Sequence, residues 1–483
     1  MSKLRKKTLD GLVWTFSQQF GLQLINFFVS IILARLLLPE EFGLIGMIAI
    51  FIAIGNSLVD GGMSSSLIRT ENPDNIDYST VFFTNLAISI FAYLLVFFLA
   101  PFIAIFFDQI ILKALLQVYC LTFIIRAFST IQSTKLNKEM NFKPQFLINV
   151  PSLIAGSILG IFLAYKGFGV WSLIWMNLAQ SLIATIQLWF YSEWTPSFIF
   201  DKERLKVHLN FGYKLTISGI LNGIIKNIYN IIIGKFFSAA QLGFFTRAKS
   251  MQELPVINVS NALKKVTYPL FSSIINDDQR LKSVFKNLMQ QVLFIIMPLL
   301  IIGIIIAEPL FRFLLTEKWL PAVPYFQILC VAGIIMPLNS YNLNILLVKG
   351  QSGQVLKLEF FKNSMILFGA LFAIPFGIYG LLWSFVGSTF ITFFLNAFAS
   401  GKLINFPIKE QLKEILPILG IGIFCGLICF YGDSIIVEFI NNDILRIFIV
   451  IIIFLFIYLL LSSLLKISAF NQIQMLVFKK TVK

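Results

Sequence analysis

The sequence has little of what most enzymes use for catalysis or for binding metals. Its 483 residues include a single histidine, His208, and four cysteines. Neither an HExxH nor a CxxC motif occurs, and the segment Gly350 to Gly353 (GQSG) lacks the lysine that would follow in a phosphate-binding loop. We therefore expect a protein that is not an enzyme and has no cofactor. An ion gradient, a substrate gradient or a partner would have to drive it.

The histidine and the cysteines do not form a recognisable site. His208 lies in the longest connecting segment, Glu193 to Tyr213, where we expect it to be solvated rather than a ligand. Cysteines inside apolar runs behave as small packing residues, so neither a disulfide framework nor a metal site is expected. The cysteines that lie in such runs are Cys120, Cys330, Cys425 and Cys429.

Charge is also scarce, and the apolar runs are long. Charged residues make up 13% of the chain and hydrophobic residues 58%, and the mean hydropathy is +0.86. A helix needs about 20 apolar residues to cross a bilayer core of about 30 Å, and such runs recur from end to end. The composition excludes a soluble protein and predicts an all-α polytopic membrane protein. The first run is too long for a cleavable signal peptide and lacks a small-residue cleavage site, so we expect it to be retained.

The apolar runs predict about fourteen transmembrane helices. Most of the net charge of +15 falls in alternate connecting segments, as expected where lysine and arginine stay on the cytoplasmic side. The charge therefore indicates no nucleic-acid partner, and both termini are expected in the cytoplasm. The predicted helices span approximately residues 13–38, 42–67, 78–107, 110–134, 145–165, 169–192, 211–237, 242–273, 287–314, 321–347, 357–376, 378–400, 413–432 and 444–465.

An internal repeat divides twelve of these helices into two sets of six. Leu33 to Leu44 (LARLLLPEEFGL) reappears about 200 residues later as Ile233 to Phe244 (IGKFFSAAQLGF). Parallel repeats of this kind suggest two lobes that rock around a site near the middle of the membrane. We expect an N-lobe over residues 1–200 and a C-lobe over residues 201–401. Two further helices and a basic cytoplasmic tail would occupy residues 402–483.

The most polar of the predicted helices spans Leu242 to Ser273. At about 100° per residue, its five charges occupy about half of the helical wheel, and apolar residues fill the other half. Because charge facing lipid is costly, such a helix should line a water-filled cavity. The alternative is an amphipathic helix that lies on the membrane surface. The candidate substrate-binding residues on this helix are Arg247, Lys249, Asn258, Asn261, Lys264 and Lys265.

Four further cations are candidates for the same cationic cavity. Arg126 lies deep in an apolar run, and Lys226 has several amide neighbours. Ionisable residues inside a membrane helix are functional hypotheses by default, although a structural ion pair would also explain Arg126. Arg35 and Lys235 occupy equivalent positions near the outer ends of the repeated helices, where snorkelling to the interface is the alternative explanation.

Carboxylates within the predicted helices are candidates for ion coupling. Asp60 and Glu253 are the two residues that would couple transport to protons or sodium ions, and neither ion is favoured over the other. For Asp60 the alternative is an ion pair with Arg69 or a neighbouring lysine. Glu308 and Arg312 have the spacing of an ion pair at the end of a helix.

A cationic cavity that is rich in amides suits a large anion with many hydroxyl groups. Lysine and arginine bind phosphate oxygens, and amide side chains hydrogen-bond to sugar hydroxyls. A lipid-linked pyrophosphate oligosaccharide has both groups, and its acyl tail can stay in the bilayer.

Four segments of the chain resemble a known family. They are Ser64 to Arg69 (SSSLIR), Asp77 to Phe83 (DYSTVFF), Leu136 to Lys143 (LNKEMNFK) and Thr246 to Pro255 (TRAKSMQELP). In these segments the chain resembles Wzx-type polysaccharide and O-antigen flippases, in the branch that includes colanic acid exporters. These flippases belong to the multidrug/oligosaccharidyl-lipid/polysaccharide exporter superfamily. The likeness extends over nearly the whole chain in consistent order.

The resemblance implies a V-shaped transporter with two lobes in the bacterial inner membrane. It would move undecaprenyl-pyrophosphate-linked repeat units from the cytoplasmic to the periplasmic leaflet by alternating access through a cationic cavity. Its products would serve exopolysaccharide, O-antigen or lipopolysaccharide biosynthesis. Besides the glycan lipid and the bilayer, a polysaccharide polymerase and a chain-length regulator are candidate partners.

Two other functions are weighed against this one. A multidrug or cation exporter of the same superfamily would need buried carboxylates to hold cations, whereas the candidate cavity is positively charged. A membrane polysaccharide polymerase would need a sizeable extracytoplasmic loop with catalytic residues, and the predicted outer loops are short.

Overall fold

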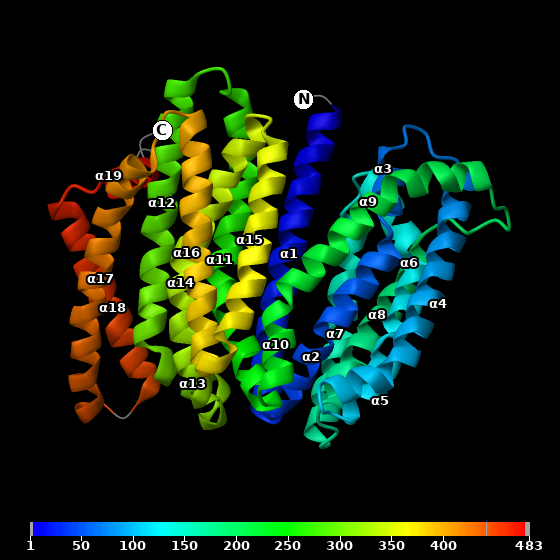
Figure 1. The fold of residues 1–483 in the computed structure, drawn as a ribbon, viewed down its shortest axis with the longest axis horizontal. Helices are drawn as coiled ribbons and strands as arrows, with labels where there is room; N and C mark the ends of the chain where they lie inside the picture. The colour runs from blue at the N-terminus through cyan, green and yellow to red at the C-terminus, as the bar shows by residue number, and fades with distance from the viewer. Residues whose placement is uncertain (1–2, 441, 479–483) are drawn as a thin grey trace. The chain divides into compact units, whose positions relative to one another are not determined.

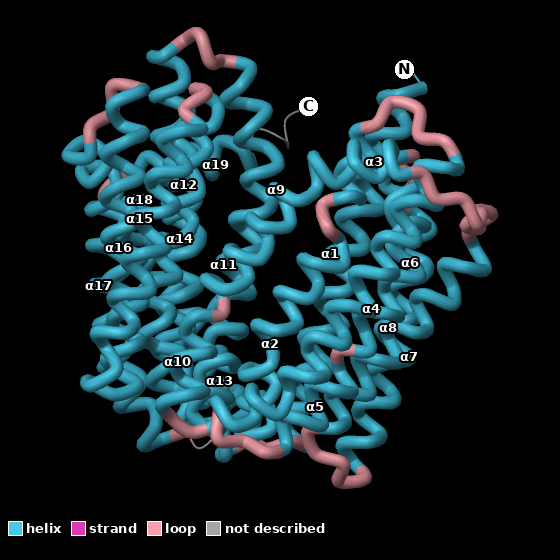
Figure 2. Tube along the Cα trace, turned by 45° about the vertical axis from the view of Figure 1, so that its right-hand side comes forward, coloured by secondary structure: helices cyan, strands magenta, loops and turns pink. Residues whose placement is uncertain are grey.

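The computed structural model describes residues 3–440 and 442–478, and these residues form helices joined by turns and loops (Figure 1). Contacts between Cα atoms divide the chain into two compact units, Met1–Gly243 and Phe244–Lys483. Within the units, the loops are mostly short and gather at the ends of the long helices (Figure 2). The predicted all-α polytopic membrane fold is confirmed.

From residue 3 onward, where the structure describes it, the first unit contains ten helices and the beginning of an eleventh. They are α1 (Lys3–Leu36), α2 (Pro39–Asp60), α3 (Met63–Arg69), α4 (Asn75–Phe106), α5 (Ile111–Tyr119), α6 (Leu121–Lys138), α7 (Lys143–Tyr165), α8 (Trp171–Tyr191), α9 (Lys202–Lys226), α10 (Ile228–Phe236) and the first residues of α11 (Ala239–Ser273). Helix α7 packs between α1 and α8, and α4 packs on α5 and α6.

Local sequence signals fix where α2, α3 and α4 begin and end. Pro39 starts α2, where its missing N–H would have no partner in any case. Gly61 and Gly62 both have left-handed backbones, with φ of 53° and 63°, and they separate α2 from α3. The side chain of Asp74 accepts the N–H of Asp77 at the start of α4, and the side chain of Asp77 accepts the N–H of Asp74.

Equivalent glycines of the repeat bring the beginnings of α2 and α11 into backbone contact. A Cβ atom on Gly43 would lie 1.8 Å from the carbonyl oxygen of Ala239. A Cβ atom on Gly243 would lie 1.9 Å from the carbonyl oxygen of Pro39. Pro39 and Gly43 correspond to Ala239 and Gly243 at the offset of about 200 residues, so the contact is reciprocal. Small residues allow membrane helices to approach this closely.

A second set of glycines places α9 against α2. Cβ atoms on Gly212, Gly219 and Gly223 would lie 2.3 Å from the Gly61 carbonyl oxygen, 3.0 Å from the Ser57 hydroxyl and 3.3 Å from the Ala53 methyl, respectively. The three positions lie on one face of the helix. Helix α9 therefore approaches α2 closely at these three glycines.

The second unit is built around α12, which has the largest fraction of buried residues among the candidate membrane spans. Helix α12 packs on α14 and α17, α14 packs on α16, and α17 packs on α18. The elements of this unit are the rest of α11, α12 (Asp278–Ile305), α13 (Ala307–Leu315), η1 (Glu317–Ala322), α14 (Val323–Val348), α15 (Ser352–Ala373), η2 (Ile374–Phe376), α16 (Gly377–Leu403), α17 (Ile408–Phe439), α18 (Asp443–Leu464) and α19 (Ser468–Phe478).

Among the described residues, eleven helices are long and apolar enough to cross a membrane, or twelve with α9 and α10, which meet at 45°. The sequence predicted about fourteen. Two features account for the difference. The segment Ser352–Leu403 is one of these eleven candidate membrane spans, although it contains two helices, α15 and α16, that pack against each other. Helix α11 is 35 residues long and carries five charged side chains, and it is not among the eleven candidate spans.

Candidate functional site

The two cations predicted on the middle of α11 contact aromatic rings. Arg247 on α11 is only 7% exposed, and its guanidinium carbon lies 5.9 Å from the centre of the Trp319 ring. The ammonium nitrogen of Lys249 lies 5.8 Å from the ring of Phe245 and 6.0 Å from that of Phe385. A cation over a ring face is attracted by the electrons of the ring, and more strongly where water is scarce. The rings therefore support positive charge on α11 in apolar surroundings.

The next turns of α11 hold polar side chains of three kinds. Glu253 is partly buried. Asn258 is exposed and donates its amide to the carbonyl of Leu254 at 2.8 Å. Gln252 is 1% exposed, beside Gly333, and within the described structure its amide nitrogen and oxygen have no hydrogen-bond partner. A buried amide without a partner is costly, so Gln252 points to a bound water or ligand group.

Three predicted residues of α11 cannot be placed. The side chains of Asn261, Lys264 and Lys265 lie outside the part that the structure describes.

The candidate cations of the first unit are mostly exposed. The guanidinium of Arg126 on α6 donates to the amide oxygen of Asn56 on α2 at 3.3 Å. Lys226 ends α9, and Arg35 lies in the last turn of α1; both are exposed. Lys235 forms an ion pair with Asp108 at 2.9 Å. The candidates are thus divided between the two units, and their convergence on one cavity remains a prediction.

Of two ion pairs considered in the sequence, one forms in the described structure and the other does not. Arg312 pairs with Glu308 at 2.5 Å and also with Asp443 at 3.2 Å, so the predicted pair at the end of a helix is confirmed. Asp60 is exposed, and within the described part of the chain it forms no ion pair with Arg69. Arg69 lies instead over the ring of Phe211, at 4.9 Å.

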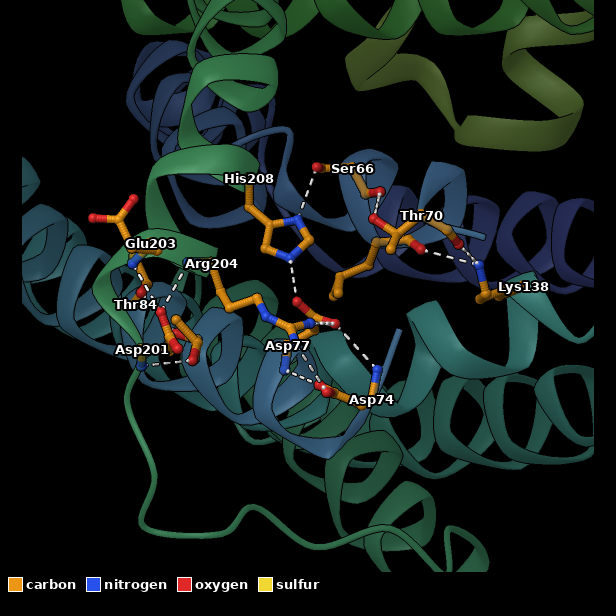
Figure 3. Close-up of polar contacts among 12 residues, drawn as sticks. Ser66, Thr70, Asp74, Asp77, Thr84, Lys138, Asp201, Glu203, Arg204 and His208 are labelled. Carbon is orange, nitrogen blue, oxygen red and sulfur yellow. Dashed lines mark hydrogen bonds and ion pairs between the residues drawn. The ribbon is translucent and has the colours of Figure 1, made fainter. Parts of the chain in front are cut away.

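The expectation that His208 is solvated in a loop is wrong. His208 lies in the second turn of α9 and is 1% exposed. Its Nδ1 is 2.9 Å from the hydroxyl of Ser66, and its Nε2 is 3.3 Å from a carboxylate oxygen of Asp77 (Figure 3). The predicted connecting segment is in fact helical from Lys202 onward, and this places the imidazole against α3 and α4.

Asp77, which is 2% exposed, also binds an arginine of α9. The guanidinium of Arg204 donates to Asp77 at 2.6 Å and to Asp74 at 3.1 Å (Figure 3). We call Ser66, Asp74, Asp77, Arg204 and His208 the α9 clasp, because they join α9 to α3 and α4. Asp77 is buried, whereas the side chain of Arg204 is 42% exposed. Removing Arg204 or His208 would therefore leave a buried carboxylate with fewer partners, which is costly.

The surroundings of the clasp are tied down by further hydrogen bonds. The segment before α9 follows the start of α4: the N–H groups of Ser197 and Asp201 donate to the hydroxyls of Ser79 and Thr80 at 3.0 and 3.1 Å. The ammonium of Lys138 donates to carbonyls at the end of α3, including that of Ile68 at 3.0 Å.

The clasp was missed because its members are far apart in the sequence. Its only sequence signal is indirect. Ser66 and Asp77 lie within segments that resemble the flippase family, as does the neighbouring Lys138. His208 and Arg204 lie in a segment without such a likeness, more than 120 residues from Asp77.

The described residues show no metal or disulfide chemistry. They contain no group of three or more His, Cys, Asp or Glu side chains that could hold a metal ion. The four cysteines are buried and free, as expected for packing residues.

Comparison with known proteins identifies the family. Residues 32–324, more than half of the chain, match the family described as polysaccharide biosynthesis protein. The teichuronic acid biosynthesis protein TuaB of Bacillus subtilis (strain 168) is 24% identical over 441 residues, which cover 89% of this chain and 90% of TuaB. The lipopolysaccharide biosynthesis protein WzxC of Escherichia coli (strain K12) is 23% identical over 369 residues, covering 75% and 74%. The succinoglycan biosynthesis transport protein ExoT of Rhizobium meliloti (strain 1021) is 25% identical over 330 residues, covering 68% and 67%.

Two solved structures share the fold. The lipid II flippase MurJ in an inward closed conformation superposes with a TM-score of 0.73 at 18% identity, over 94% of this chain and 98% of MurJ. A multidrug resistance MATE family transporter of the MOP superfamily, in an inward-facing conformation, gives a TM-score of 0.60 at 17% identity, over 80% and 96%.

The chain therefore has the multi-pass membrane fold of MurJ and of the MATE family transporter. The chain belongs to the polysaccharide biosynthesis protein family, and it is similar to WzxC. The resemblance seen in the sequence is confirmed.

Proposed function

We propose that this protein moves undecaprenyl-pyrophosphate-linked oligosaccharide repeat units from the cytoplasmic to the periplasmic leaflet of a bacterial inner membrane. Both termini would lie in the cytoplasm, and the two repeats would alternate access to the site. The relatives named for teichuronic acid, lipopolysaccharide and succinoglycan biosynthesis support a glycan cargo. The likeness in fold to a lipid II flippase supports a flippase mechanism.

The observation that carries this proposal is the buried cation Arg247, with Lys249 one half-turn away on the same helix. A guanidinium held away from bulk water interacts strongly with an anion that reaches it, because water screens the attraction less there. A pyrophosphate offers the anionic oxygens that arginine binds in a bidentate manner and lysine binds as a point charge. The unsatisfied amide of Gln252 would add a hydrogen bond to a phosphate or sugar oxygen.

The remaining candidates take secondary roles in this proposal. Arg126, Lys226, Arg35, Lys235, Asn258, Asn261, Lys264 and Lys265 would extend the cationic path for the sugar and pyrophosphate. Asp60 and Glu253 would be the groups that couple transport to an ion. A polysaccharide polymerase and a chain-length regulator would act on the product.

The test is the position of the glycan lipid in a deletion strain. Deleting the gene should trap the undecaprenyl-pyrophosphate glycan in the cytoplasmic leaflet and abolish the surface polysaccharide. The wild-type gene on a plasmid should restore both, and mass spectrometry of the trapped lipid would identify the repeat unit. If the glycan lipid still reached the periplasmic leaflet and sensitivity to cationic drugs rose, the proposal would be wrong and a drug exporter would replace it.

A further inference from the structure

The α9 clasp has an unbalanced charge when its histidine is neutral. Asp74 and Asp77 each carry a negative charge, and Arg204 supplies one positive charge. One negative charge is left over beside the buried imidazole of His208, which is 3.3 Å from Asp77. A proton on the imidazole would bring the clasp to zero net charge. Histidine is the side chain that ordinarily gains or loses its proton between about pH 5 and 8.

The hydrogen-bond partners of His208 accept both charge states. Neutral imidazole can donate from Nε2 to Asp77 and accept the hydroxyl hydrogen of Ser66 at Nδ1. Protonated imidazole donates from both nitrogens, to the carboxylate and to the oxygen of Ser66. Protonation therefore leaves no ring nitrogen without a partner, and it converts the contact with Asp77 into an ion pair.

Other charged groups lie near the clasp on α9 and on the elements packed against it. The carboxylate of Asp201, at the start of α9, accepts the N–H groups of Glu203 and Arg204, and the ammonium of Lys138 donates to carbonyls of α3. Glu203 and Lys206 on α9 are exposed. Helix α2 contributes Asp60, which is exposed, and α3 contributes Arg69, which lies over the ring of Phe211. These two charges have opposite signs. On α10, Lys235 is paired with Asp108.

The clasp borders a cavity through its residue Asp74. A cavity of about 770 Å³ is lined by Asp74 together with Asn75 and Tyr78 of α4 and Lys135 and Lys138 of α6, among other residues. Because Asp74 is partly exposed and shares Arg204 with Asp77, protons can exchange with the solvent beside the buried pair.

Two further features of α9 bear on how it could move away from α3 and α4. Beyond the clasp, α9 approaches α2 closely at Gly212, Gly219 and Gly223. At its other end it bends by 45° into α10. The clasp is thus the polar attachment of α9 to α3 and α4, and the bend into α10 is a point about which α9 can pivot when the clasp opens.

We propose that His208 is a proton-binding site and that the proton bound there holds α9 against α3 and α4. The bound proton adds the positive charge that the clasp lacks, so docking is strongest at acidic pH. Docking weakens as the pH rises and the imidazole loses its proton. The role of this movement in transport rests on the proposed flippase function, whereas the docking itself does not.

The docking can be measured directly by the distance between two spin labels. Glu203 on α9 and Glu71 between α3 and α4 are exposed and lie outside the clasp, so cysteines placed there can carry labels. The native cysteines are buried and can stay. In full-length protein in lipid nanodiscs, we expect one short distance at about pH 5.5. A second, longer distance should grow at least about fivefold in population by about pH 8.

Two variants separate the histidine from other titrating groups. His208→Gln keeps a hydrogen-bonding side chain without a titratable proton and should make the distance distribution independent of pH. Lys206→Gln removes an exposed charge two residues away and should leave the pH dependence unchanged. A pH-independent distribution in the wild-type protein would overturn the proposal without any variant. So would a His208→Gln protein that responds to pH as the wild type does.

The same sample distinguishes this proposal from the proposed function. If the glycan lipid is not translocated at any pH while the distances still respond to pH through His208, the proton site stands and the flippase function fails. If translocation occurs and the distances ignore pH, the flippase stands and the proton site fails.

Discussion

Arg247 shows what a single cation can contribute on a membrane helix. It lies on α11 with 7% of its surface exposed, over the indole ring of Trp319. A side chain that served only to keep a helix soluble would point to water, and Arg247 does not. We therefore expect its charge to act on the transported lipid.

At this residue scale, Arg247→Ala should lower the export of the glycan lipid by at least about tenfold, because the loss of a desolvated charge contact costs several kcal/mol. Arg247→Lys keeps the charge but loses the bidentate geometry and should retain part of the activity. The measurement is surface polysaccharide at matched expression in the complemented deletion strain.

The matched control is Lys409→Ala on α17, because Lys409 is an exposed lysine of the described structure outside every candidate site. It should export like the wild type. Equal export by the Arg247→Ala and Lys409→Ala proteins would show that the buried guanidinium does not act on the cargo. The melting temperature of each protein in detergent separates a loss of function from a loss of folding.

At the scale of elements, the crossing of α2 and α11 depends on two glycines. The backbones meet so closely that a methyl group on Gly43 or Gly243 would lie within 2 Å of a carbonyl oxygen. A backbone carbonyl cannot move aside to make room for a methyl group unless its whole helix shifts. The repeat places one such glycine on each helix, so both sides of the contact have the same requirement.

Gly43→Ala and Gly243→Ala should each destabilise the protein by about 1–3 kcal/mol, the usual cost of overpacking. The measurement is the melting temperature in detergent. Gly420→Ala on α17 is the control, because its Cβ atom would meet nothing within 4 Å. Alanine in a helix is favoured over glycine by about 1 kcal/mol, so this change should leave the melting temperature equal or higher. If the Gly43→Ala protein had the same melting temperature as the wild type, the close backbone contact between α2 and α11 would be refuted.

At the scale of the whole molecule, the number of membrane crossings decides where the C-terminus lies. If α11 crosses the membrane, fourteen crossings put both termini on the same side. If α11 lay on the surface, the number would be odd and the termini would lie on opposite sides. The prediction that both termini are cytoplasmic therefore also tests α11.

Alkaline phosphatase, which is active only outside the cytoplasm, should be inactive when fused after Lys483. It should be active when fused after Phe439, between α17 and α18. Green fluorescent protein should give the opposite result at the same positions. An active phosphatase at the C-terminus, with equal amounts of fusion protein on immunoblots, would contradict the predicted topology and favour a surface position for α11.

The features that depend on local pattern could be predicted from the sequence. Long apolar runs can satisfy their backbone groups in lipid only as helices, so the all-α membrane fold followed from composition. The pair Glu308 and Arg312 followed from helical spacing, and the packing role of the cysteines followed from their apolar neighbours. The repeat marked Gly43 and Gly243 as equivalent, although not as partners in contact.

Which distant residues meet could be seen only once the chain was folded. His208 lies 142 residues from Ser66 and 131 residues from Asp77, and no periodicity links residues so far apart. The same holds for Arg247 and Trp319, whose contact requires α11 and η1 to pack. Burial of a charged or titratable side chain depends on what the rest of the chain places around it, so the sequence gives the candidate groups and the fold gives them their environment.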